Sequence, residues 1–122
     1  MTERLTFSQI LLLLLYALGM AGGQLLFKSA ALRYGASGEI GDRVIALVQN
    51  AYFLSAVLLY AGLAVLWVWL LSFTSLSRAY PFVALAFAIT PLLGGWMFGE
   101  ALSFRLIVGL LLILSGLFFI AA

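Results

Sequence analysis

The sequence predicts an all-α membrane protein in which four transmembrane helices form an up-down bundle within a single domain, residues 1–122. Hydrophobic residues make up 66% of the chain and charged residues only 8%, with a mean hydropathy of +1.26. Soluble domains are about 45–50% apolar and about 25% charged. The apolar residues also gather into four runs, each near the ~20 residues that a helix needs to cross a bilayer. Little of the chain remains for a soluble domain.

The four predicted spans are separated by one long connection and two short ones. Lipid offers no hydrogen-bond partners to the backbone, so each span should be a helix. The first run continues past Phe27 without a small-residue cleavage site. We therefore expect it to remain as a transmembrane helix rather than to be removed as a signal peptide. The expected helices cover residues 7–32, 51–72, 76–98 and 103–121.

The connections determine how the expected helices are arranged. Residues 33–50 form the polar stretch, which we expect to be a loop followed by a short interfacial piece at residues 44–48. Residues 73–75 and 99–102 are so few that they join antiparallel neighbours. This arrangement places both chain ends on the same side of the membrane.

Two prolines and a serine mark expected helix ends and bends. Pro81 lies near the first turn of the third span, where its missing amide costs little, and it is the first of two positions at which we expect that span to kink. Pro91 lies in the middle of that span and should bend it. Ser103 precedes the fourth span and is a suitable N-cap, because its hydroxyl can accept a hydrogen bond from a free first-turn amide.

Several classes of function are disfavoured by what the sequence lacks. There is no Cys and no His, which removes thiolate chemistry, the usual proton shuttle and the commonest metal ligand. No Asp or Glu falls in the middle of a predicted span, where a proton-coupled cation transporter usually holds a carboxylate. The net charge of +2 is too small to suggest a nucleic-acid partner. We expect neither an enzyme nor a bound metal or cofactor.

The end of the first span concentrates unusual residues for an apolar helix. Gln24 and Lys28 are four residues apart and therefore share one helix face. In one interpretation Lys28 extends its amine to the membrane interface and Gln24 bonds a neighbouring helix. In the other, the two line a cavity and bind an anion. Gly19, Gly22 and Gly23 thin the helix beside them, which favours close helix approach or leaves room for a ligand.

Charged and aromatic residues also gather at the ends of the third span. Arg78 and Tyr80 are either interfacial anchors or a polar entry to a cavity, with Arg78 gripping a phosphate. Glu100 is either a partner of the dipole of the fourth helix or a counter-ion to Lys28 or Arg105. The predicted topology places Glu100 and Lys28 on the same side of the membrane, where they can pair.

Two seven-residue spacings define candidate helix faces. Tyr60 and Trp67 share one face of the second span, where they form either aromatic packing or an amphipathic wall for a sugar or a lipid chain. Gly109 and Gly116 share one face of the fourth span and form a smooth stripe suited to helix pairing. Because four helices are few to enclose a path across a membrane, we expect a dimer.

Four motifs together carry a family resemblance over nearly the whole chain. They are Gly23-Gln-Leu-Leu-Phe-Lys28, Arg78-Ala-Tyr-Pro81, Phe98-Gly-Glu100 and the Gly109-x6-Gly116 stripe. In this order and spacing they resemble the four-helix members of the drug/metabolite transporter superfamily. The resemblance implies a fold like that of the small multidrug resistance proteins, with the glycine stripe as the dimer interface.

Two branches of that superfamily are candidates. Small multidrug resistance proteins exchange cations for protons with a glutamate in the first helix, whose place here, counted back from Lys28, is held by Met20. The other branch is the small subunits of the aminoarabinose-phosphoundecaprenol flippase, which are similar in the Gly-Gln-x-x-x-Lys element, in Ala-Tyr-Pro and in Glu100. The chain departs from that branch at Arg78, where the larger metabolite exporters of the superfamily are more similar.

The flippase resemblance implies movement of an undecaprenyl-phosphate-linked sugar across the bacterial inner membrane by a homodimer or a heterodimer of similar subunits. Lys28 would hold the phosphate, Gln24 and Tyr80 would supply hydrogen bonds, Arg78 would be a second anion contact and Glu100 an orienting counter-ion. The alternatives are a small-metabolite or drug exporter and a membrane subunit without transport activity. The sequence leaves the sugar, the coupling ion and the orientation open.

Overall fold

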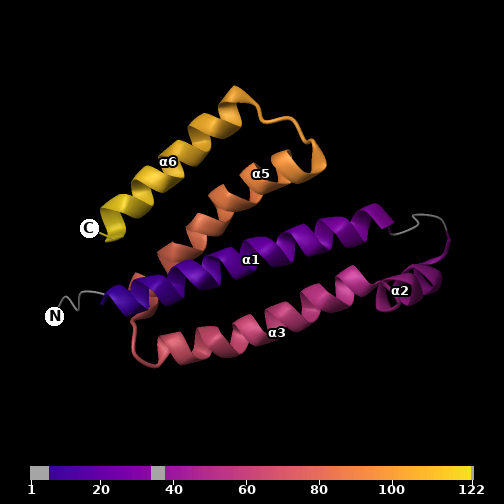
Figure 1. Ribbon diagram of the computed structural model, residues 1–122, viewed down its shortest axis with the longest axis horizontal. Coiled ribbons are helices and arrows are strands. Elements are labelled where there is room, and N and C mark those ends of the chain that lie inside the picture. The colour runs from indigo at the N-terminus through magenta and orange to yellow at the C-terminus, as the bar shows by residue number, and fades with distance from the viewer. Residues whose placement is uncertain (1–5, 34–37, 122) are drawn as a thin grey trace.

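The computed structural model describes residues 6–33 and 38–121, and every regular element in these ranges is a helix (Figure 1). Three stretches of this part of the chain are long and apolar enough to cross a membrane, and the last helix is apolar but shorter. The predicted all-helical membrane class is confirmed, while the fourth span stays a prediction. The elements are α1 (Phe7–Arg33), α2 (Ile40–Val48), α3 (Ala51–Leu71), α4 (Leu76–Ala79), η1 (Tyr80–Val83), α5 (Ala84–Phe98) and α6 (Phe104–Ala121).

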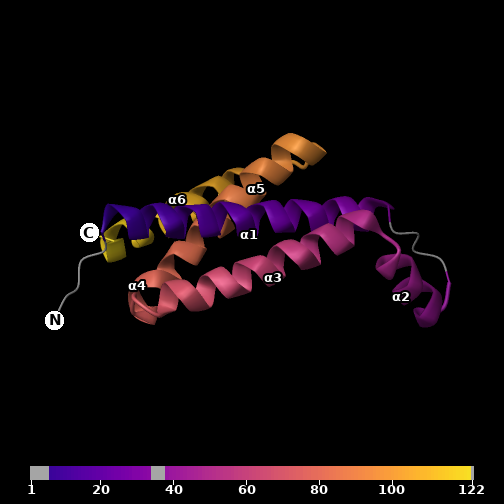
Figure 2. The same cartoon turned by 60° about the horizontal axis from the view of Figure 1, so that its bottom comes forward.

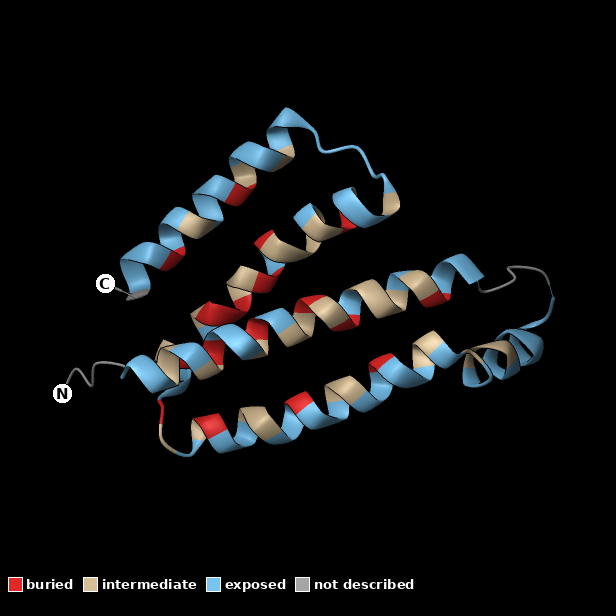
Figure 3. Ribbon diagram, viewed as in Figure 1, coloured by how far each residue is buried: buried red, intermediate tan, exposed pale blue. Residues whose placement is uncertain are grey.

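Helix α1 is the centre of the arrangement, with α3 packed along one side and α5 along another (Figures 1 and 2). A small core joins them near the N-terminal end of α1, where the chain turns from α3 into α4. It is formed by Leu13, Leu70, Ala79 and Phe82. Most of the remaining helix surface is apolar and exposed, as Figure 3 shows for α6. Such a surface suits lipid or another protein chain.

The seam between α1 and α3 is closed by two glycines. A Cβ atom at Gly23 would lie only 2.6 Å from the ring of Tyr60, and one at Gly19 would lie 2.9 Å from Leu63. Real Cβ atoms essentially never approach so closely, so a side chain at Gly23 would displace the Tyr60 ring and one at Gly19 would displace the end of the Leu63 side chain. A Cβ at Gly22, by contrast, would meet nothing within 4 Å.

Asn50 connects the C-terminal end of α1 to the N-terminal end of α3. Its Oδ1 accepts hydrogen bonds from the backbone amides of Tyr52 and Phe53, at 2.9 and 3.3 Å, and so caps α3. Its Nδ2 donates to the Ala30 carbonyl of α1 at 3.1 Å. One side chain therefore satisfies free backbone groups of both helices.

The third predicted span is not one continuous α-helix. Residues 76–98 divide into α4, the 3-10 segment η1 and α5. Pro81, which lies in the first turn of η1, has no backbone amide to donate, and this favours the tighter helix. The change from an α-helix to a 3-10 helix after Ala79 lies next to Pro81, and the kink expected at Pro81 stays a prediction. Pro91 lies inside α5, and the bend expected there stays a prediction.

The interfacial piece expected at residues 44–48 is longer in the structure. Helix α2 begins at Ile40, after the N-cap Glu39, and Gly38 before them has a φ of 120°, which favours glycine. It leaves the line of α3 at the end of the bundle (Figure 2). The expected interfacial residues are therefore the second half of an amphipathic helix, with apolar side chains exposed at Ile40, Val44, Ile45 and Val48.

The start of α6 agrees with the sequence. The amide of Leu106 donates to Ser103 Oγ at 3.1 Å, which confirms Ser103 as the N-cap. Helix α6 packs on α5 and η1, burying Leu110 and Leu117. Gly116 is exposed and Gly109 is half-buried, and a Cβ at either would meet nothing within 4 Å. Their role as a dimer interface stays a prediction.

Candidate functional site

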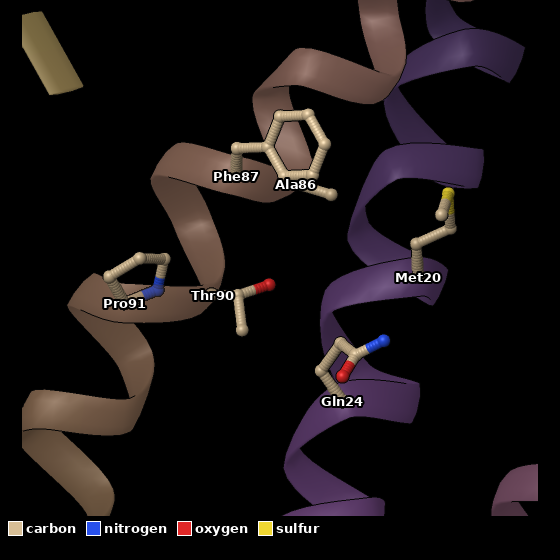
Figure 4. Close-up of a pocket in the computed structure, with 6 residues that line it drawn as sticks. All are labelled: Met20, Gln24, Ala86, Phe87, Thr90 and Pro91. Carbon is tan, nitrogen blue, oxygen red and sulfur yellow. The ribbon is translucent and has the colours of Figure 1, made fainter. Parts of the chain in front are cut away.

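A groove runs between α1 and α5. Two cavities of about 350 and 340 Å³ both border Gln24, Thr90 and Pro91 and therefore lie next to each other; together they are here called the α1–α5 groove. Figure 4 shows its apolar half. Its lining residues are Met20, Gln24, Leu25 and Lys28 from α1, Ala86, Phe87, Thr90, Pro91, Gly94 and Phe98 from α5, and Glu100.

An ion pair marks the polar end of the groove. Lys28 Nζ lies 3.3 Å from Glu100 Oε1, and the two side chains are 45% and 52% exposed. The predicted pairing of these residues is confirmed. Half-exposed ion pairs contribute little to stability, typically about 0–1 kcal/mol. Both charges therefore remain accessible to a ligand.

The segment after α5 holds Glu100 over the groove. Gly99 takes the left-handed conformation, with φ of 66°, and turns the chain back toward α5. Leu102 then packs against Gly95, where a Cβ would lie 3.0 Å from Leu102 Cγ. A Cβ at Gly94 would lie 3.8 Å from Glu100 Oε2. Gly95 thus lets this connection lie close to the last turn of α5, whereas the distance at Gly94 is an ordinary van der Waals contact.

A buried hydroxyl lies in the middle of the groove. Thr90 Oγ1 is buried and has no hydrogen-bond partner within the described ranges. Figure 4 shows it pointing from α5 toward α1, with Met20 and Gln24 opposite. A buried polar atom without a partner lowers the stability of the folded state by about 1–3 kcal/mol. A ligand atom that forms a hydrogen bond with Thr90 Oγ1 would remove this penalty.

Gln24 stands between the groove and the α1–α3 seam. Its Nε2 donates to the hydroxyl of Tyr60 at 2.9 Å, and that hydroxyl donates to the Met20 carbonyl at 2.9 Å. The expected bond from Gln24 to a neighbouring helix is therefore present. The amide keeps a carbonyl oxygen and a second N–H that can face a ligand.

The remaining predicted site residues lie elsewhere. Tyr60 stacks on Phe27 at 5.4 Å inside the α1–α3 seam. Trp67 stacks on Tyr16 at 4.8 Å and meets Tyr80 edge-on at 6.3 Å. None of these aromatic residues lines the α1–α5 groove, which favours packing as the role of Tyr60 and Trp67, while the hydrogen-bonding role of the exposed Tyr80 stays a prediction.

Arg78 and Lys28 are not brought together. Arg78 is half-buried in α4, two residues before Tyr80, which meets the Tyr16–Trp67 stack. Tyr16 precedes Lys28 by twelve residues on α1, which is about 18 Å along the helix axis. One anion cannot contact both residues in this arrangement. Anion binding by Arg78, at its own end of the bundle, stays a prediction.

Sequence reasoning missed Thr90. A hydroxyl residue directly before a proline, in the middle of an apolar span, was the available signal. Threonine hydroxyls in membrane helices usually bond their own backbone or a neighbouring helix, so the type of residue alone does not indicate a site. Its lack of a partner became visible only when α1 and α5 were placed side by side.

Two relatives support the family suggested by the sequence. A protein of Sodalis glossinidius (strain morsitans) is 34% identical over 106 residues, covering 87% of this chain and 90% of the relative. A protein of Serratia proteamaculans (strain 568) is 36% identical over 107 residues, covering 88% and 90%. Both are named probable 4-amino-4-deoxy-L-arabinose-phosphoundecaprenol flippase subunit ArnE.

Neither a family model nor a solved structure matches the chain. The two relatives nevertheless match nearly the whole of it, and their names confirm the resemblance to flippase subunits. The predicted transport function agrees with the names of the relatives. The predicted membrane-spanning helices agree with the long apolar helices of the structure. This multi-pass membrane protein belongs to the family of the ArnE flippase subunits.

Proposed function

We propose that the protein is a subunit of a flippase that moves an undecaprenyl-phosphate-linked sugar across the bacterial inner membrane. The names of its relatives support lipid-linked sugar transport. The observation that carries the proposal is the α1–α5 groove, in which an accessible lysine lies next to an otherwise largely apolar lining. An amphiphile with one anionic group and a long hydrocarbon chain has this same division of chemistry.

Each half of the groove has a role in this proposal. Lys28 binds the lipid phosphate, because an ammonium at the edge of an apolar site is a strong partner for a phosphate oxygen. Gln24 and Thr90 donate hydrogen bonds to the remaining phosphate oxygens. The polyprenyl chain leaves past Met20 and Phe87 and stays in lipid, so that only the headgroup needs a path through protein.

A second subunit completes that path. We propose that α6 is the fourth span and that its exposed face, with Gly109 and Gly116, packs against a similar subunit, identical or not. The relatives are themselves named as subunits. Rocking of two subunits about a site between them would expose the headgroup to each side of the membrane in turn.

The test is native mass spectrometry of the purified protein, with Lys28→Met as the variant. Methionine keeps the apolar stem of the side chain and removes the charge. The wild type should retain a polyprenyl phosphate, and Lys28→Met should lose at least about tenfold in lipid occupancy. Arg105→Gln is the matched control, because it removes a cation of α6 that is exposed and does not line the groove.

Two results would count against the proposal. Equal lipid occupancy in Lys28→Met and wild type would show that Lys28 does not bind the lipid phosphate. Substrate-dependent proton antiport by the protein in liposomes, without lipid movement, would instead favour a small-metabolite or drug exporter.

A further inference from the structure

The charges of the α1–α5 groove do not describe a simple anion site. Its lining contains one cation, Lys28, and one anion, Glu100, in contact at 3.3 Å. An isolated phosphate bound to Lys28 would be placed within a few ångströms of the Glu100 carboxylate. Two like charges so close repel each other, and the repulsion is stronger at the edge of a membrane than in water.

A positive group on the ligand removes this conflict. We propose that Glu100 binds a protonated amine of the headgroup while Lys28 binds its phosphate, so that the pair selects a zwitterionic headgroup over an anionic one. The inference rests on the function proposed above and assigns Glu100 as the residue that determines specificity for the sugar. In the Lys28–Glu100 pair, Glu100 stands where the phosphate would contact Lys28, and Lys28 stands where the amine would contact Glu100.

The backbone around Glu100 favours a cation there. The connection is held against the end of α5 by the contact between Leu102 and Gly95 and by the left-handed turn at Gly99. Helix α5 ends at Phe98, and the C-terminal end of a helix carries a partial negative charge that attracts cations. The carboxylate and this helix end therefore act in the same direction.

The order of groups along the groove matches the order of groups in such a lipid. The apolar half, with Met20 and Phe87, is followed by Gln24 and Thr90, then by Lys28, and Glu100 lies at the polar end. A polyprenyl-phosphate amino sugar has its hydrocarbon chain, its phosphate and its amine in this sequence. The half-exposed side chains of Lys28 and Glu100 can separate to admit the sugar between them.

The test compares two probes that differ at the amine, which is positively charged in one and converted to a neutral, larger amide in the other. One is the polyprenyl phosphate carrying 4-amino-4-deoxyarabinose, and the other is the same lipid with its amine acetylated. Their affinities for the full-length protein in nanodiscs are measured by native mass spectrometry. The wild type should prefer the free amine by about tenfold, as expected for one partly desolvated ion pair.

Variants of Glu100 assign that preference to the carboxylate. Glu100→Gln should bind the two lipids equally and should bind the acetylated lipid at least as tightly as the wild type, because the competing anion is gone. Glu100→Asp should keep part of the preference. Glu39→Gln is the matched control, since it removes an exposed carboxylate outside the groove, and it should retain the full preference.

The outcomes separate this inference from the function on which it rests. Equal binding of both lipids by the wild type, or a preference that survives in Glu100→Gln, overturns the role of Glu100 and leaves lipid binding intact. Failure of the wild type to bind either lipid overturns the proposed function, and the role of Glu100 with it.

Discussion

The two sides of α1 differ in how closely the neighbouring helix packs against them. Toward α3, glycines at 19 and 23 let Leu63 and the Tyr60 ring come into close contact, and the seam is closed by stacked aromatic rings. Toward α5, the same helix presents Met20, Gln24 and Lys28 to an open groove. The comparison separates residues that hold the protein together from residues that are free to bind something else.

The hydrogen bonds follow the same division. On the α3 side, the Tyr60 hydroxyl both accepts from Gln24 and donates to the Met20 carbonyl. On the α5 side, Thr90 Oγ1 is buried without a partner in the described part of the chain. A region that serves only stability gains nothing from such an atom. In the same part of the chain Thr74 Oγ1, in the turn between α3 and α4, is also buried without a partner, so the Thr90 hydroxyl supports the proposed site only together with the groove around it.

The largest effect should come from filling the α1–α3 seam. Gly23→Ala places a methyl group 2.6 Å from the Tyr60 ring, which forces the helices apart and should cost about 1–3 kcal/mol of stability. Thermal unfolding in detergent measures the loss. Gly22→Ala is the control on the same helix, because its methyl group meets nothing within 4 Å and alanine favours the helix. Similar melting temperatures for the two variants would contradict a closed seam.

A smaller effect should follow from removing one hydroxyl at the boundary of the two regions. Tyr60→Phe keeps the stacking on Phe27 but loses the bonds to Gln24 and to the Met20 carbonyl. We expect a stability loss of about 1 kcal/mol, since hydrogen bonds between membrane helices are individually weak. Unfolding by denaturant in mixed micelles measures it. A loss as large as that of Gly23→Ala would mean that the hydroxyl, rather than the packing, holds the seam together.

The smallest effect on stability should come from the groove itself. Thr90→Val keeps the shape of the side chain and removes a buried hydroxyl without a partner, so the empty protein should be unchanged within about 0.5 kcal/mol or slightly more stable. Polyprenyl phosphate binding should nevertheless fall by roughly tenfold, through the lost hydrogen bond to a charged oxygen. Thermal unfolding and native mass spectrometry of one preparation give both values. A clear loss of stability would place Thr90 with the structural residues instead.

The sequence predicted the parts of the molecule that depend on composition and on chain length. The apolar runs predicted helices, and the short connection after Phe98 put Glu100 on the same side as Lys28, where the structure shows them paired. Ser103 was predicted as a cap from its place before an apolar run, and it is one. These features are local, or they follow from topology alone.

The sequence did not show which helix face meets which neighbour. A soluble helix reveals its buried face by a polar stripe on the other side, but these helices are apolar all round and carry almost no such signal. From the sequence, Tyr60 and Trp67 could therefore be interpreted as residues that line a ligand site, although they lie in the α1–α3 seam. For the same reason, Thr90 could not be assigned to the groove.

The connection between α5 and α6 joins two functions that the rest of the chain keeps apart. Residues 99–103 carry the carboxylate of the groove at one end and the cap of the helix proposed for subunit contact at the other. A displacement of α6 against α5 therefore passes to Glu100 through only a few backbone bonds. In the function proposed above, assembly with a second subunit and the charge presented to the headgroup would be coupled through this loop.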